Sequence, residues 1–413
     1  MKKKSFLFFP VEIGISHMTR TFAIAEALYQ RGHKVIVALP KRKQFIFKQS
    51  PVTLVDIVPY IKDDFKIKIS DFLRYDFLTK LVDEELSLIK IHQPDVVIVD
   101  FRISALTAAK IANVKTVSIS NGDILPCGAI LPNPGFSKII NYLVNPVIRY
   151  GLYHGLRFYL QSLMRIISEN GVRTTLDQWF KDVCYIVPEP DFLYPPLRNQ
   201  LNINNVGLLS WKGFDIENPD WLKDIRPNGK TVYLTFGGTG FDKEKLIKLS
   251  KALVENGYRV IVSCGTIANP KDFLKSDNLY IAKFLPGTLI SKSVDLVICA
   301  GGYGTISEAI ANGTPILINP FNPDQIIHAA RMQELGVARS LFKIQATDLK
   351  SILTFDWKRI ENKGKNISVS EVLKNTKEML SNFGKYKIAI KRYNANYKSN
   401  DGPIQAAEII ENL

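Results

Sequence analysis

The segment LVICAGGYGTISEA, residues 296–309, contains the clearest structural pattern of the chain. Its apolar start, residues 296–300, predicts a buried strand, and the glycine-rich residues 301–304 predict a loop that leads into a helix at 305–311. Glycines let backbone N–H groups approach an anion closely, and a helix N-terminus adds further donors and a positive partial charge. The segment therefore predicts either a phosphate-binding loop or a tight strand-to-helix turn.

The same alternation of strands and helices continues in both directions along the chain. In the second half we expect strands at 231–236, 259–263 and 315–318 with helices at 243–255 and 325–335. In the first half we expect strands at 5–10, 34–39, 52–58, 95–100 and 115–120 with helices at 18–30, 81–92 and 105–112. Short apolar strands separated by helices predict parallel sheets covered on both faces. The fold class is thus α/β, with two Rossmann-like doubly wound domains that we expect to face each other across a cleft.

Length and punctuation suggest where these domains end. The 413 residues suit two domains. Four prolines between residues 188 and 196 indicate the approach to a linker. We expect one domain at 1–215, a second at 216–390, and a helical segment at 391–413 that crosses back to the first domain.

Composition limits the class of partner. The formal net charge is +15, which suits a nucleotide, an anionic membrane surface or nucleic acid, or serves solubility alone. We do not expect nucleic acid as a partner, because no short recognition motif for it occurs. The four cysteines, Cys127, Cys184, Cys264 and Cys299, contain no Cys-x-x-Cys pair. They therefore indicate a cytoplasmic protein without a disulfide framework or zinc site.

One region departs from the alternating pattern. Residues 136–167 mix large apolar residues with Arg149, Arg157 and Arg165. They predict helices that are apolar on one side and basic on the other. Such helices either pack in the core or form an acceptor-binding lid or a contact with the inner face of the membrane. No apolar stretch approaches the roughly 20 residues of a membrane span.

Three further patterns in the second half suggest ligand contacts. Gly237 to Gly240 again follows a strand and precedes a helix, and two such loops in one domain suggest a diphosphate. Glu308 stands three residues after Thr305, as in a capping box, although a carboxylate there could equally bind a ribose diol. Asp324 is a natural N-cap, and with Gln325 it offers a carboxylate and an amide suited to sugar hydroxyls.

Taken together, these segments resemble the donor-binding signature of the UDP-glycosyltransferase superfamily. The resemblance rests on FLP at 284–286, on residues 295–309, and on NGTP at 312–315, DQ at 324–325 and ELG at 334–336. It continues in GISHMTR at 14–20, AEAL at 25–28, RGHKV at 31–35, PDVVIVD at 94–100 and AAEII at 406–410. This similarity implies the GT-B fold and a bacterial or archaeal type of glycosyltransferase family 1.

The resemblance assigns roles by position: residues 1–215 would bind the acceptor, and residues 216–390 would bind the nucleotide sugar. His17 would be the general base that deprotonates the acceptor, and Asp100 would orient it. The residues expected to bind the donor are Gly238, Thr239, Gly301, Gly302, Gly304 and Thr305 at the diphosphate, Glu308 at the ribose, Asp324 and Gln325 at the sugar, and Phe284 and Leu285 at the base. The residues support His17 independently, because it follows the first strand at the start of a helix, where the dipole disfavours imidazolium. Asp100 ends another parallel strand, so both side chains can reach one edge of the sheet.

The expected reaction is an inverting transfer of a hexose from a nucleoside-diphosphate sugar, most simply a UDP-sugar, to a hydroxyl of a hydrophobic or lipid-linked acceptor. We expect no cofactor and no metal, because the donor half has no suitable Asp-x-Asp motif and fixed N–H groups can stabilise the leaving diphosphate. One departure from the family concerns Ala300, where many members carry His. The alternatives are a nucleotide-sugar epimerase of the same fold, a non-catalytic accessory protein and a nucleic-acid-binding module.

Overall fold

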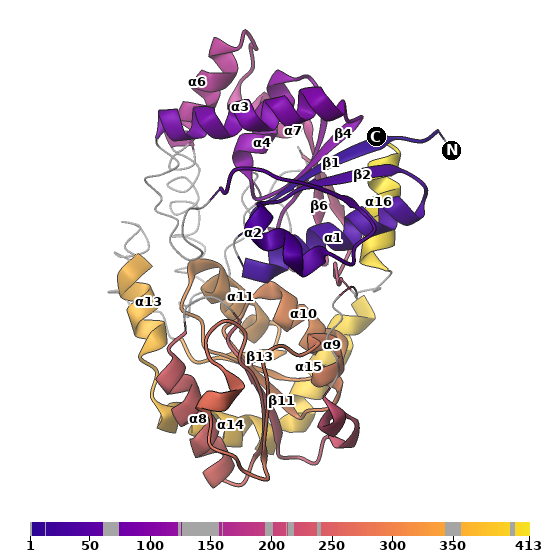
Figure 1. Cartoon of the computed structure of the whole chain (residues 1–413). Coiled ribbons are helices and arrows are strands. Elements are labelled where there is room, and N and C mark those ends of the chain that lie inside the picture. The colour runs from indigo at the N-terminus through magenta and orange to yellow at the C-terminus, as the bar shows by residue number, and fades with distance from the viewer. Residues whose placement is uncertain are drawn as a thin grey trace. The chain divides into compact units, whose positions relative to one another are not determined.

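The computed structural model describes residues 2–12, 14–60, 74–122, 125, 157–158, 160–194, 201–211, 213, 219–237, 241–342, 357–396 and 401–413. It divides the chain into two compact units, each built around one parallel sheet (Figure 1). Unit 1 comprises the described residues of Met1–Ile130, Pro146–Phe214 and Ser399–Leu413. Unit 2 comprises those of Asp215–Lys398.

The sheet of unit 1 has seven strands in the order β3-β2-β1-β4-β5-β6-β7, and all neighbours are parallel. The strands are β1 Ser5–Pro10, β2 Lys34–Ala38, β3 Thr53–Val55, β4 Val96–Asp100, β5 Lys115–Ile119, β6 Val183–Val187 and β7 Asn202–Asn205. The two central strands are buried almost throughout, as expected for a parallel sheet covered on both faces. Pro10 of β1 pairs with Asp100 of β4. The two strands therefore end level at the carboxyl edge of the sheet.

Helices cover both faces of this sheet. They are α1 Gly14–Gln30, α2 Lys41–Gln44, η1 Phe45–Phe47, α3 Tyr75–His92, α4 Ile103–Ile111, α6 Gln161–Glu169, α7 Leu176–Lys181 and α16 Gly402–Glu411. Because side chains alternate along a strand, Phe6 and Phe8 join a core with α1 and α16, whereas Leu7 and Phe9 join a second core with α3, α4, α6 and α7.

The last helix of the chain belongs to unit 1, as Figure 1 shows for the yellow α16 beside α1. Ala406 and Ile410 of α16 are fully buried in the core that α1 forms with the sheet. The expected change of domain at residue 390 falls inside helix α15, Phe383–Asn396. The chain returns to unit 1 only at Ser399, because α15 packs on helices of unit 2.

Unit 2 has a six-stranded parallel sheet in the order β10-β9-β8-β11-β12-β13. Its strands are β8 Thr231–Thr235, β9 Arg259–Ser263, β10 Leu279–Ala282, β11 Leu296–Cys299, β12 Ile316–Ile318 and β13 Ala338–Ser340. Its helices are η4 Asp220–Asp224, α8 Lys243–Glu255, η5 Pro270–Asp272, α9 Gly287–Lys292, α10 Tyr303–Ala311, α11 Pro323–Glu334, α13 Trp357–Lys365, α14 Val369–Ser381 and α15.

Four strands were not expected from the sequence. The edge strands β7, β10 and β13 are only three or four residues long and only partly buried for the most part, so they lack a strong apolar pattern. The fourth, β6, is fully buried but lies just before the proline-rich residues 188–196. Those prolines therefore follow a strand of unit 1, and the unit continues beyond them to Phe214.

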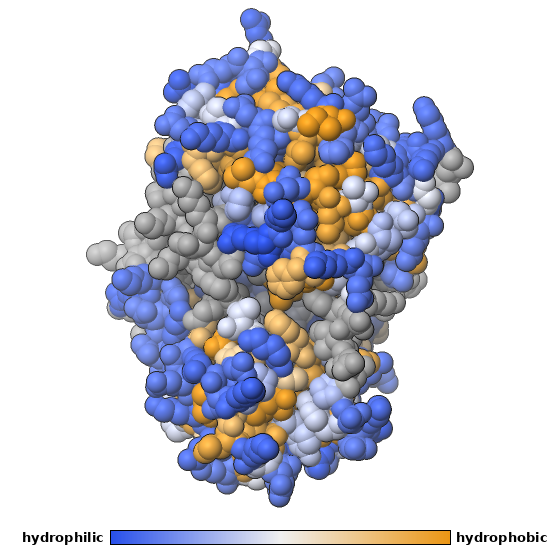
Figure 2. All heavy atoms as spheres, in the orientation of Figure 1, coloured by the Kyte–Doolittle hydropathy of each residue, from blue (hydrophilic) through white to orange (hydrophobic). Residues whose placement is uncertain are grey.

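In the view of Figure 2, hydrophilic residues and small apolar areas alternate over both units. None of the helices in the described ranges is long and apolar enough to cross a membrane.

Candidate active site

The structure brings His17 and Asp100 together in unit 1. Helix α1 begins at Gly14, so His17 lies in its first turn, and Asp100 is the last residue of β4. The two atoms His17 Nδ1 and Asp100 Oδ1 are 2.8 Å apart. An ionised carboxylate can only accept a hydrogen bond, so Nδ1 donates and Nε2 keeps its lone pair. The Asp100 side chain is completely buried, whereas 25% of the His17 side chain is exposed. The imidazole can therefore meet a substrate.

Arg20 completes this cluster, and sequence reasoning gave it no role. Its Nε donates to Asp100 Oδ2 and its Nη2 to Asp100 Oδ1, each at 2.5 Å. Nη2 is also 3.1 Å from His17 Nδ1, and Nη1 donates to Asn121 Oδ1 at 2.5 Å. The only signal in the sequence is the spacing of three residues between His17 and Arg20, which places both on one face of α1.

The surroundings of Asp100 keep it ionised. Burial alone would raise the pKa of this carboxyl group, because a charge is costly away from water. The positive charge of Arg20, the interaction with His17 and the hydrogen bonds from both outweigh burial, so the pKa of Asp100 lies below its ordinary value. At neutral pH Asp100 is thus an ionised carboxylate that the Arg20 guanidinium holds.

The turn after Asp100 is held in an unfavourable conformation. Phe101 has φ of +56°, a value that bulky residues rarely adopt. The backbone is fixed before it, where Val11 N–H donates to the Asp100 carbonyl at 2.9 Å. It is fixed after it by the fully buried Arg102, whose Nε donates to Glu85 Oε1 at 2.5 Å. The surrounding contacts therefore impose the strain, and the Phe101 ring lies 5.8 Å from the His17 ring, centroid to centroid.

In unit 2 the glycine loop leads from β11 into α10, and its three glycines differ. Gly301 has φ of +99°, and an added Cβ would approach the Ile318 side chain to 2.7 Å, so the fold itself requires glycine there. At Gly302 and Gly304 an added Cβ would meet nothing within 4 Å. Packing does not require glycine at these two positions, which leaves the backbone open for close approach of a ligand.

Glu308 does not cap its helix. Helix α10 begins at Tyr303 with Gly302 as N-cap, so Thr305 is already the third helical residue. The capping box considered for Thr305 and Glu308 is therefore wrong. Among the described residues, no hydrogen bond or ion pair involves the Glu308 carboxylate, and burial raises its pKa to about 7. It packs against Gly287, where an added Cβ would collide with Glu308 Oε2.

The start of α11 also differs from expectation. Asn322, not Asp324, is the N-cap, because Pro323 is suited to the first helical position. Gln325 is buried, and its Oε1 accepts hydrogen bonds from the N–H groups of Phe321 and Asn322 at 3.1 and 3.2 Å. Its side-chain oxygen thus closes the helix end, whereas Asp324 is exposed beside it.

A second histidine supports the glycine loop and was missed. His328 is buried on α11, its Nδ1 lies 3.1 Å from the Gly301 carbonyl oxygen, and its ring is 5.7 Å from that of Tyr303. No motif in the sequence indicated this role. The contact ties α11 to the loop after β11.

The remaining predicted residues have mixed outcomes. Phe284 is exposed by 38%, so its ring is available to a ligand, but Leu285 is buried. Gly238 and Thr239 lie outside the described residues, as do Cys127 and most of 136–167. The described end of that segment belongs to α6, which buries Leu163, Ile166 and Ile167 in unit 1. There the structure supports the core helix rather than a lid.

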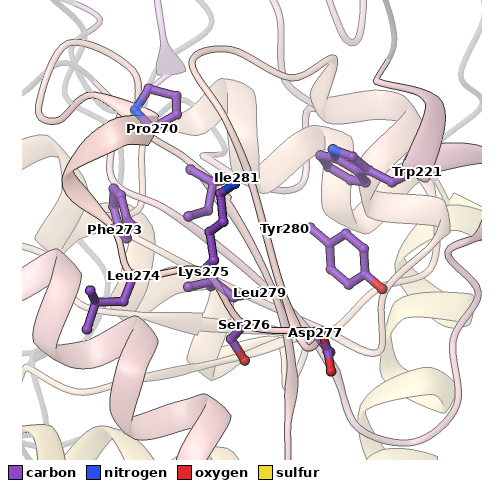
Figure 3. Close-up of a pocket in the computed structure, with 10 residues that line it drawn as sticks. All are labelled: Trp221, Pro270, Phe273, Leu274, Lys275, Ser276, Asp277, Leu279, Tyr280 and Ile281. Carbon is purple, nitrogen blue, oxygen red and sulfur yellow. The ribbon is translucent and has the colours of Figure 1, made fainter.

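The structure also has a pocket of about 490 Å³ in unit 2 (Figure 3). It follows edge strand β10, with Trp221 and Tyr280 on one side and Phe273 and Leu274 on the other. None of the predicted site residues lines it. Among the residues that the structure describes, no group of three or more His, Cys, Asp or Glu side chains could hold a metal ion.

Solved structures match the whole chain: the glycotransferase of kitacinnamycin covers 100% of this chain and 99% of its own at a TM-score of 0.69 and 15% identity. The spinosyn rhamnosyltransferase SpnG complexed with thymidine diphosphate covers 98% of this chain and 100% of its own, at a TM-score of 0.63 and 16% identity. The fold is GT-B.

Sequence comparison agrees with this fold. Residues 231–382 match the model of the glycosyltransferase family 28 C-terminal domain. A PGL/p-HBAD biosynthesis glycosyltransferase of Mycobacterium tuberculosis is 25% identical over 352 residues, which cover 81% of this chain and 80% of that protein. A PGL/p-HBAD biosynthesis rhamnosyltransferase of Mycobacterium bovis is 23% identical over 350 residues, covering 81% and 76%.

These matches support glycosyltransferase activity for the GT-B chain, as the sequence predicted. They do not support the finer assignment to family 1, because the matching model is that of family 28. Family 1 membership stays a prediction.

Proposed function

We propose that this chain is an inverting glycosyltransferase that moves a sugar from a nucleoside-diphosphate sugar to an acceptor hydroxyl. The observation that carries the proposal is the His17–Asp100 pair at the carboxyl edge of the unit 1 sheet. A neutral imidazole with its Nδ1 proton held by a buried carboxylate is suited to accept a proton at Nε2. This is the chemistry that an attacking hydroxyl needs.

Unit 2 supplies the features expected for the donor. The backbone at Gly302 and Gly304, together with the start of α10, fits a diphosphate that gains negative charge as the sugar leaves. The Glu308 carboxylate, which has no hydrogen bond within the described part of the chain, suits the ribose hydroxyls, and exposed Asp324 suits the sugar. Phe284 offers a ring to the nucleobase. We propose that Gln325 contributes to sugar binding only through its side-chain NH2 group, because its side-chain oxygen closes α11.

In the proposed reaction, His17 takes the proton of the acceptor hydroxyl as its oxygen attacks the anomeric carbon. The bond to the diphosphate breaks on the opposite face, which inverts the configuration. A well-placed base of this kind contributes roughly 10²–10⁴-fold to the rate. Because fixed N–H groups neutralise the leaving group, we propose that transfer needs no metal ion, and EDTA should leave the activity unchanged.

The substrates are proposed by class. A UDP-sugar is the first choice of donor, and a TDP-sugar is the second because SpnG was solved with thymidine diphosphate. The names of the relatives refer to PGL/p-HBAD biosynthesis, and we propose a hydrophobic or lipid-linked acceptor for this chain. The enzyme would act in the cytoplasm, with a peripheral contact to an anionic membrane as a further proposal.

A donor screen followed by product analysis tests the proposal. Thermal shifts are measured with UDP-, TDP- and GDP-sugars, and the best donor is then incubated with a panel of hydroxylated acceptors under mass spectrometry. We expect one donor class to stabilise the chain and a product heavier by one sugar to form. An epimerase would release nucleotide without an acceptor, and absence of any donor binding would indicate an accessory protein.

A further inference from the structure

The cluster around His17 holds more charge than a base and its orienting carboxylate need. Arg20 places its guanidinium on both oxygens of Asp100 and, at 3.1 Å, beside the same imidazole nitrogen that Asp100 binds. We infer that Arg20 is a positioning residue that fixes Asp100 and keeps His17 in its neutral, proton-accepting form. This inference rests on the proposed function, in which His17 must be neutral to act.

The geometric part of the argument concerns freedom of movement. A carboxylate bound at both oxygens by a guanidinium cannot rotate without losing two charge-assisted hydrogen bonds. The guanidinium is fixed in turn, because Nη1 donates to Asn121 just beyond β5. Arg20 thus joins α1, β4 and the end of β5, and the buried Asp100 oxygen stays directed at His17 Nδ1.

The electrostatic part concerns the cost of protonation. A carboxylate beside an imidazole favours the imidazolium ion, and an adjacent guanidinium opposes it. Among the described residues the charged groups in contact with His17 are Asp100 and Arg20 alone. The nearby Glu12 forms ion pairs with Arg42 and Arg102 instead. With Arg20 present, a proton that binds to the His17–Asp100 pair is repelled by the positive charge of the guanidinium.

The experiment compares three variants with the parent chain. Arg20→Gln removes both the positive charge and the paired hydrogen bonds to Asp100. Arg20→Lys keeps the charge but loses the paired hydrogen bonds, and Asn121→Ala keeps the guanidinium but removes its hydrogen bond to Asn121. Arg31→Gln is the matched control, because Arg31 also forms an ion pair in unit 1, with Glu411 of α16. Thermal melting confirms that each variant is folded.

The first readout is the titration of His17, which is monitored by NMR of the histidine ring protons. Because the chain has five histidines, the His17 signals are assigned by comparison with a His17→Gln sample. In Arg20→Gln we expect His17 to titrate about one pH unit or more higher than in the parent. In Arg20→Lys, Asn121→Ala and Arg31→Gln it should titrate as in the parent. An unchanged or lower titration in Arg20→Gln overturns the electrostatic role. This readout needs no substrate, so it stands even if the proposed activity fails.

The second readout is the pH profile of kcat/KM with the best donor and acceptor from the screen. The acid limb should move to higher pH in Arg20→Gln only. The plateau should fall about tenfold in Arg20→Gln and Arg20→Lys and severalfold in Asn121→Ala, with Arg31→Gln unchanged. If Arg20→Gln does not fold, the other two variants decide: parent-like plateaus in both, with parent-like melting, overturn the positioning role.

Discussion

Unit 1 and unit 2 prepare their candidate sites differently. In unit 1 the polar side chains bind one another, so His17, Asp100 and Arg20 are set before any substrate arrives. In unit 2 the backbone at Gly302 and Gly304 is open, and the Glu308 carboxylate has no hydrogen bond within the described residues. Unit 1 is thus organised by its own charges, whereas the open groups of unit 2 are those to which we propose that a ligand binds.

The largest effect should come from the imidazole of unit 1. In His17→Ala we expect transfer to fall at least about a hundredfold, because the acceptor hydroxyl loses its base. Donor affinity, measured by calorimetry, should change little, since the donor contacts that we propose lie in unit 2. If His17→Ala turns over as fast as the parent, His17 is not the base, and the contrast drawn here between the two units fails.

Glu308→Gln should separate binding from stability. We expect nucleotide affinity to fall about tenfold or more, because a hydrogen bond to a charged group contributes about 1.5–3 kcal/mol. Burial raises the pKa of Glu308 from its ordinary 4.5 to about 7 in the folded chain. Folding is therefore disfavoured progressively as pH rises from about 4.5 to about 7, and the variant should be more stable than the parent above pH 7, by about 1–3 kcal/mol.

The measurement for Glu308→Gln is calorimetry with UDP together with thermal melting at pH 5 and pH 8. The gain in melting temperature should appear at pH 8 and shrink at pH 5. A loss of stability without a loss of affinity would mean that the carboxylate serves the fold.

Gly304→Ala and Gly301→Ala form a matched pair in the glycine loop. Gly304 lies in the first turn of α10 with open space before it, so alanine should raise helix stability by up to about 1 kcal/mol while weakening nucleotide binding severalfold. Gly301→Ala should destabilise unit 2, because φ of +99° and the Ile318 side chain both oppose a Cβ. Melting curves and UDP titrations check both, and unaltered binding in Gly304→Ala would contradict an open phosphate loop.

The smallest effect should come from charges of unit 1 that lie away from the site. The hydrogen bond from Arg31 holds the pKa of Glu411 below its ordinary value, so this pair stabilises the fold at neutral pH and ceases to do so as the carboxylate is protonated in acid. Glu411→Gln should lower the melting temperature by a few degrees at pH 7, with no change in kcat/KM. The difference from the parent should disappear toward pH 3. A change in activity would show that the contact of α16 reaches the site.

Much of this architecture could be predicted from the sequence. The bounds expected for β1, α8 and β9 agree with the structure, because their apolar runs and flanking polar residues are clear. The short edge strands gave no such signal. The helices α10 and α11 begin two residues earlier than the apolar pattern suggested, with Gly302 as the N-cap of α10 and Pro323 as the first residue of α11.

The α/β alternation, the glycine loop after β11 and the choice of His17 and Asp100 could all be predicted without the structure, since each depends on residue type and local spacing. The folded chain was needed to show that Arg20 binds both oxygens of Asp100, that Gln325 closes α11 and that the half-buried Glu308 has no hydrogen bond within the described residues. Such roles depend on which side chains from distant segments meet at a strand end. Spacing along the chain does not encode those distances, because they are set by the packing of helices against the sheet.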